Sequence, residues 1–111
     1  TMVQFDISKI NEMADEERHL VVNKWLHDMV PECDGFTEDP LGGHTIGEIV
    51  LNSPSGFKPY FAHYGDFEGE YKARWMLAET IDDCVTAVEQ KCEACVYWIE
   101  DVDGNEIWRN G

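Results

Sequence analysis

The residues whose spacing most suggests chemistry are Cys92 and Cys95, which are separated by two residues. Such a pair is typical of one half of a zinc site or of a thiol–disulfide pair. Zinc needs four ligands, and neither Cys33 nor Cys84 belongs to a second close pair. Redox pairs usually begin a helix, where the dipole stabilises a thiolate, but this pair follows a predicted helix. We expect apolar packing without metal or cofactor, and a further role for Cys92 and Cys95 stays open.

His63 is the residue best suited to acid–base chemistry. It lies on a predicted strand among aromatic residues, and a carboxylate such as that of Glu70 could lie beside it across the sheet. A histidine next to a carboxylate is a general-base arrangement. Neither a recognisable nucleophile motif nor a glycine-rich phosphate loop accompanies it. We therefore expect a structural or solvated histidine, and we rank an enzyme centred on His63 below the other functions.

Basic and aromatic residues coincide in the middle of the chain. Lys72 and Arg74 share one side of a predicted strand, and two tyrosines belong to the strand before it. If helices cover the other side of the sheet, these residues form an open face that could hold a small anion or an acidic peptide. Ordinary cross-strand pairing with neighbouring glutamates is the alternative. The candidate ligand or interface face comprises Tyr60, His63, Tyr64, Lys72, Arg74 and Trp108.

Oxygen-bearing side chains gather near the C-terminus, at Asp101, Asp103, Asn105 and Glu106. Their spacing is not that of the twelve-residue EF-hand loop. The Asp-Gly dipeptide within this segment instead favours a tight hairpin, because glycine readily adopts a positive φ. We expect a turn here rather than a calcium site.

The net charge of −15 is the most unusual global property, because 23 acidic residues face eight basic ones. Residues 1–40 and residues 79–111 each carry −7, whereas residues 41–78 carry −1. A chain so poor in Lys and Arg is not expected to bind nucleic acid directly or to adhere to an anionic membrane. A basic protein partner would be attracted, although many acidic proteins have no such partner.

Local patterns predict most of the secondary structure. Apolar residues at helical spacing predict a helix from about 15 to 29, which ends before Pro31. Thr80 and the acids after it predict the start of a second helix. Alternating apolar and polar residues predict strands at 57–64, 71–78, 95–100 and 106–109.

The segment 45–52 has two interpretations. Ile49, Val50 and Leu51 are strand formers followed by a turn cluster, which favours a strand paired in a hairpin. Thr45 and Glu48 instead have the spacing of a capping box, which favours a short helical turn. We adopt the strand and leave the helical turn as the alternative.

Together these elements predict an α+β fold over 1–111 as a single domain. We expect a helical segment at 6–30, an acidic loop at 31–44, and the sheet with the second helix at 45–111. The expected order is α-β-β-β-α-β-β, with one antiparallel sheet of about five strands and both main helices on one face. No apolar run reaches the 18 residues of a membrane span and no secretory signal is visible, so we expect a cytoplasmic protein.

The function best supported by these features is that of a small, acidic, non-catalytic interaction protein, of the inhibitor, antidote or adaptor type. The alternative is a small-molecule-binding domain that uses the aromatic face. Trp108 lies three residues from the chain end, where it would expose apolar area unless it packed beneath the last helix or against a second copy. We favour a homodimer in which Trp108 is part of the interface.

Overall fold

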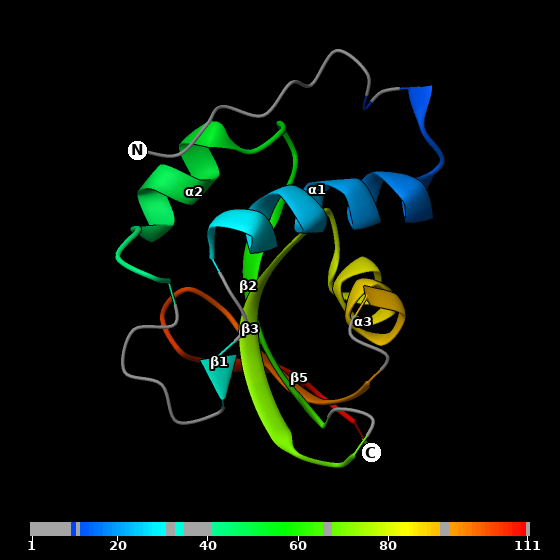
Figure 1. Cartoon of the computed structure of the whole chain (residues 1–111), viewed down its shortest axis with the longest axis vertical. Coiled ribbons are helices and arrows are strands. Elements are labelled where there is room, and N and C mark those ends of the chain that lie inside the picture. The colour runs from blue at the N-terminus through cyan, green and yellow to red at the C-terminus, as the bar shows by residue number, and fades with distance from the viewer. Residues whose placement is uncertain are drawn as a thin grey trace.

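The computed structural model describes residues 10, 12–30, 33–34, 41–65, 68–91 and 94–110. The helices are α1 (Asp15–Met29), α2 (Ile46–Asn52) and α3 (Ile81–Lys91). The strands are β1 (Cys33–Asp34), β2 (Lys58–Gly65), β3 (Tyr71–Ala78), β4 (Cys95–Glu100) and β5 (Glu106–Arg109). The described strands form one antiparallel sheet in the order β1-β3-β2-β4-β5 (Figure 1). The predicted α+β class with a single antiparallel sheet is confirmed.

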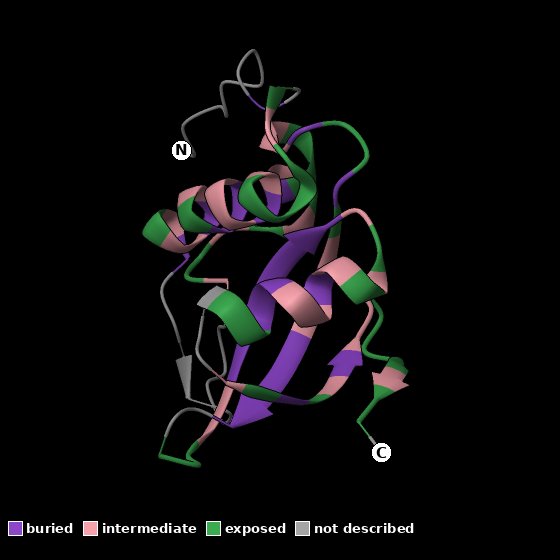
Figure 2. Cartoon of the chain, turned by 90° about the vertical axis from the view of Figure 1, so that its right-hand side faces the viewer, coloured by how far each residue is buried: buried purple, intermediate pink, exposed green. Residues whose placement is uncertain are grey.

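One face of the sheet is covered by α3, whose buried residues include Cys84, Ala87 and Val88. These side chains pack against the even-numbered positions of β2 and β3, which share a face because side chains alternate along a strand. Figure 2 shows α3 lying across the buried part of the strands. The sheet residues of this α3-side core are Tyr60, Ala62, Tyr64, Met76, Ala78, Val96 and Ile99.

The apolar side of α1 belongs to a second cluster. Val22 and Leu26 are fully buried there with Leu77, and Trp75 joins the same cluster. Trp75 and Leu77 occupy odd positions of β3, so they lie on the face opposite the α3-side core. The prediction that both main helices pack on one face is therefore wrong, because α1 packs beside the part of β3 that β1 does not cover, whereas α3 occupies the other face.

A polar stripe of α1 closes the outer edge of β3. The Asn23 side chain donates from Nδ2 to the carbonyl of Leu77 at 2.8 Å and accepts the Leu77 N–H on Oδ1 at 2.7 Å. It thereby replaces a neighbouring strand at that residue. Unpaired backbone groups at a sheet edge can otherwise pair with the strands of other chains, and a covering helix prevents this pairing.

The turns before and after Asn23 continue this contact. Nε2 of His19 accepts the N–H of Glu79 at 3.1 Å, and Nε2 of His27 lies 2.8 Å from the carbonyl oxygen of Trp75, to which it donates. Four helical residues rise about 6.0 Å and two strand residues rise about 6.8 Å, so side chains four apart on the helix match alternate residues of the strand. Further along the same edge, β1 pairs with β3.

The segment 45–52 is helical, and the predicted strand there is wrong. Thr45 caps α2, because its Oγ1 accepts the N–H of Glu48 at 3.1 Å. Ile49 is buried, whereas Val50 and Leu51 are exposed. The two apolar residues after Ile49 therefore reflect no strand alternation, and the capping pattern is the signal that decided the structure.

The order of elements differs from the prediction at these places. In the described residues the order is α-β-α-β-β-α-β-β, because β1 lies inside the predicted acidic loop and α2 replaces the predicted strand. Residues 6–9 of the predicted helical segment, and 31–32 and 35–40 of the loop, lie outside the described residues. Among the helices that the structure describes, none is long and apolar enough to cross a membrane.

Candidate functional site

His63 is the centre of a relay of close polar contacts on the face of the sheet opposite α3. Its contact with Tyr71 is a hydrogen bond, whereas Nε2 lies close to the Glu100 carboxylate without making a hydrogen bond. Its Nδ1 lies 2.6 Å from the hydroxyl oxygen of Tyr71, and its Nε2 lies 2.8 Å from Oε2 of Glu100. A carboxylate can only accept, so we assign the imidazole proton to Nε2. Nδ1 then accepts the hydroxyl proton of Tyr71. The chain of groups is phenol, imidazole and carboxylate.

Aromatic rings enclose this imidazole. The ring of Trp98 stacks on His63 with a centroid distance of 4.1 Å and an interplanar angle of 12°, and Phe61 meets it edge-on at 4.8 Å. The indole nitrogen of Trp98 also donates to Oε2 of Glu100 at 2.7 Å. On the outer strand, the guanidinium of Arg109 lies 5.5 Å from the Trp98 ring centroid, within the range of a cation–π contact.

Burial sets the charge state of the relay. Only 6 % of His63 is exposed, and this desolvation lowers the pKa of the imidazole below its ordinary value, while the Glu100 carboxylate opposes that shift. The imidazole of His63 is therefore neutral at pH 7. A neutral imidazole whose Nδ1 lone pair already accepts the Tyr71 hydroxyl is able to take that proton.

Strand register explains why these residues meet. His63 pairs with Trp98 between β2 and β4, and Phe61 pairs with Glu100 one step along the same face. The predicted carboxylate partner, Glu70, is wrong: its Oε2 lies 3.6 Å from Nζ of Lys72 in an exposed ion pair. The alternation of Trp98 and Glu100 along β4 was the available signal, but the neighbouring strand could not be identified from the sequence.

The other predicted face residues lie on the α3 side, away from His63. Tyr60 and Tyr64 are buried in the α3-side core, and Arg74 is also buried. Lys72 is partly exposed. The expectation that these residues form an open face with His63 is wrong, because His63 occupies an odd position of β2 and the tyrosines occupy even ones. Trp108 packs against the α3-side core, which is one of its two predicted environments.

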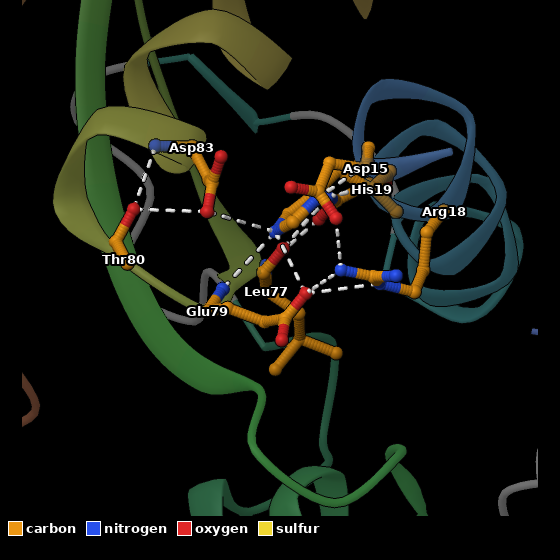
Figure 3. Close-up of polar contacts among 8 residues, drawn as sticks. Asp15, Arg18, His19, Leu77, Glu79, Thr80 and Asp83 are labelled. Carbon is orange, nitrogen blue, oxygen red and sulfur yellow. Dashed lines mark hydrogen bonds and ion pairs between the residues drawn. The ribbon is translucent and has the colours of Figure 1, made fainter. Parts of the chain in front are cut away.

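A second polar cluster lies where α1 and α3 begin (Figure 3). Arg18 of α1 donates from Nε to Oε1 of Glu79 at 2.9 Å and also pairs with Asp15. Glu16 accepts a hydrogen bond at 3.1 Å from Gln90 in the last turn of α3, so the start of α1 also contacts the far end of α3. We define the acidic junction as Asp15, Glu16, Glu17, Glu79, Asp82 and Asp83.

His19 is buried beneath the acidic junction and is held by the backbone. Its Nδ1 lies 2.7 Å from the carbonyl oxygen of Asp15, and its Nε2 accepts the N–H of Glu79. Oδ2 of Asp83 lies 3.6 Å from the same Nε2 (Figure 3). These contacts assign the proton to Nδ1, which donates to the carbonyl. The imidazole thus joins α1, the end of β3 and the first turn of α3.

Thr80 confirms the predicted start of the second helix. Its Oγ1 accepts the N–H of Asp83 at 3.1 Å, and its hydroxyl donates to Oδ2 of Asp83 at 2.9 Å. The N-cap therefore also fixes the side chain of Asp83, which faces His19. Asp83 therefore belongs both to the capped first turn of α3 and to the acidic junction.

No group of three or more metal-ligating side chains occurs in the described part of the chain. Cys84 is a free thiol buried in the α3-side core, Cys95 is free and exposed, and Cys92 lies outside the described residues. Oδ1 of Asp101 accepts the N–H groups of Asp103 and Asn105, at 2.9 and 3.0 Å. These backbone hydrogen bonds lower the pKa of Asp101, and they hold its carboxylate in the hairpin turn.

The fold and these two clusters define an acidic α+β protein with one relay-bearing sheet. No family model matches the chain, and neither a curated protein nor a solved structure shows significant similarity to it.

Proposed function

We propose that the protein acts by binding a basic protein partner through the acidic junction. The observation that carries this proposal is the convergence of acids from distant parts of the sequence: Arg18 of α1 bonds to Glu79, which is 61 residues away. The two acidic thirds of the chain thereby contribute to one surface. Attraction between such a surface and a basic partner accelerates association, and it weakens as salt rises.

The acids of the junction are held in place before any partner arrives. Arg18 orients Glu79 and Asp15, and Thr80 orients Asp83. Side chains that are already ordered lose less rotamer freedom on binding. Glu17 and Asp82 are exposed members of the junction, and their carboxylates add charge to the same surface.

The experiment uses nona-arginine as the basic probe and nuclear magnetic resonance titration as the readout. The double variant Glu17→Gln/Asp82→Asn removes two exposed acids of the junction. The matched control, Glu70→Gln/Asp103→Asn, removes two exposed acids from hairpin turns elsewhere. Two exposed charge pairs contribute about 0.5 kcal/mol each, so the junction variant should bind about fivefold more weakly. Equal losses in both variants would show that net charge, and not this surface, attracts the probe.

The cytoplasm is the compartment that we propose, supported by the free thiols of Cys84 and Cys95. We also propose weak self-association through β5, which ends the sheet, carries the exposed Ile107 and follows the turn that exposes Val102. The net charge opposes it, so the dimer fraction in sedimentation should rise with salt. A monomer at high concentration and high salt would exclude this dimer.

A further inference from the structure

We propose that Tyr71 is a reactive phenol, activated by His63 and Glu100, which accepts an acyl group from a neutral or cationic ester. The relay has the geometry of an activated nucleophile. The hydroxyl oxygen of Tyr71 lies 2.6 Å from the base and the base lies 2.8 Å from its carboxylate. A nucleophile within hydrogen-bond reach of a base, which a third group orients, is the general form of a catalytic triad.

Exposure places the reacting end of the relay at Tyr71. The side chain of His63 is 7 % exposed and that of Glu100 is 24 % exposed, while Tyr71 is partly exposed. A substrate that reaches the phenol would not reach the imidazole, whose ring is stacked on Trp98. His63 therefore acts only through the hydroxyl proton that it receives.

A second tyrosine, Tyr97, lies over the strand that pairs with the strand of Tyr71. Gly65 of β2 pairs directly with Tyr71 of β3. The hydroxyl oxygen of Tyr97 occupies the space above Gly65, because a Cβ there would lie only 2.0 Å from it. Gly65 therefore leaves room for the Tyr97 ring next to the strand that carries Tyr71.

The step balances with groups that the structure holds and one ester. The Tyr71 oxygen attacks the carbonyl carbon while its proton passes to Nδ1 of His63, and Glu100 stabilises the imidazolium. The ester C–O bond then breaks, and the leaving alcohol takes the proton from Nδ1. Tyr71 is left acylated, and the base is restored. At neutral pH an ordinary phenol, with a pKa of about 10, keeps its proton, so the base is needed.

Charge selects the class of ester. The chain carries a net charge of −15, and Glu100 lies inside the site itself. This field repels an anionic substrate such as a phosphate ester and tolerates a neutral or cationic one. The inference is independent of the acidic junction, which shares no residue with the relay.

The test uses p-nitrophenyl acetate as the ester, with p-nitrophenolate release and peptide mapping of acetylated tyrosines as readouts. Tyr71 should acetylate faster than the exposed Tyr97. Tyr71→Phe, which keeps the ring, should abolish that product, and Glu100→Gln should slow it by about 10²-fold, the lower end of general-base effects. Lys24→Ala, which removes an exposed ion pair with Asp28 on α1, should acetylate as fast as the wild type.

The pH profile separates activation from a merely structural relay. With His63 as the base, the acetylation rate at Tyr71 should reach its plateau by neutral pH. An unassisted phenol would instead keep accelerating towards pH 10. Nuclear magnetic resonance spectra of Glu100→Gln will show whether the variant is folded. Acetylation of Tyr71 that is no faster than that of Tyr97, or a rate that keeps rising to pH 10, would overturn the proposal.

Discussion

His19 and His63 are both buried beside carboxylates, yet they are bonded to different parts of the chain. His19 donates to one backbone carbonyl and accepts one backbone N–H, so it joins α1 to the end of β3. The polar contacts of His63 are with side chains: it is hydrogen-bonded to the phenol of Tyr71 and lies 2.8 Å from the carboxylate of Glu100. The same residue type therefore holds the fold together in one region and is available for proton transfer in the other.

This difference shows how a histidine beside an acid should be judged. A ring whose nitrogens are used by the backbone cannot change its bonds without disturbing an element. A ring bonded to side chains can exchange a proton while the strands remain paired. The comparison predicts large stability effects around His19 and pH effects around His63.

The largest effect is expected where the backbone edge depends on α1. Asn23→Ala leaves the N–H and C=O of Leu77 buried without their side-chain partner, and should lower the free energy of unfolding by about 3 kcal/mol. Urea denaturation measures it. The adjacent Lys24→Ala, which removes only an exposed ion pair with Asp28, should cost about 0.5 kcal/mol. Similar losses in the two variants would contradict the role of the stripe.

The next effect belongs to the relay side of the sheet. Gly65→Ala places a Cβ against the hydroxyl end of the exposed Tyr97 ring, which must swing aside, and should destabilise the protein by about 1 kcal/mol, the low end of overpacking effects. Adding Tyr97→Ala removes the obstructing ring, so the double variant should lose less than the sum of the single losses. Additive losses in urea denaturation would mean that Tyr97 does not occupy this space in solution.

The pH effect follows from His63. Burial lowers its folded-state pKa below the ordinary 6.5, so below pH 6.5 the unfolded chain binds this proton more readily. Stability should therefore fall as the pH drops from 6.5 towards the folded pKa, by at most about 1.4 kcal/mol per pH unit for one proton. Urea denaturation between pH 7 and pH 5 measures the slope.

Two variants sharpen the pH measurement. His63→Gln should reduce the slope below pH 6.5, because the titrating group is gone. Glu100→Gln removes the charge that opposes desolvation, so it should lower the pKa of His63 further and extend the loss of stability to lower pH. An unchanged slope in His63→Gln would assign the pH dependence to other groups.

The smallest effects are expected at the helix caps. Thr80→Ala removes the cap of α3 and the hydroxyl that orients Asp83, and should cost about 1 kcal/mol. It should also shift the imidazole resonances of His19 and leave those of His63 in place. Thr45→Ala removes the cap of the short α2 and should leave both imidazoles unchanged. A shift at His63 in either variant would show that the two regions are coupled.

The sequence by itself determined the elements whose signals are local. Helical spacing placed α1 at 15–29, and Thr80 marked the start of α3. Capping and periodicity are decided by residues within a few positions of one another, so they can be read from one segment. Where two local signals competed, as in 45–52, the capping pair Thr45 and Glu48 decided the structure.

Part of the candidate site was also accessible from the sequence. His63 was identified as the residue suited to acid–base chemistry and was expected to lie near a carboxylate. The carboxylate is Glu100 and the phenol is Tyr71, and neither was predicted. The sequence favoured Glu70, an acid close to His63 in the chain, because it does not show that β4 lies next to β2.

Only the tertiary structure decided which strands became neighbours and which edge α1 covered. Strand order brings Glu100 of β4 beside β2, and the stripe of His19, Asn23 and His27 meets the free edge of β3. These partners are selected by the joint burial of both sheet faces and by the need to pair every edge group. That selection depends on all the elements at once, and no single segment of the sequence contains it.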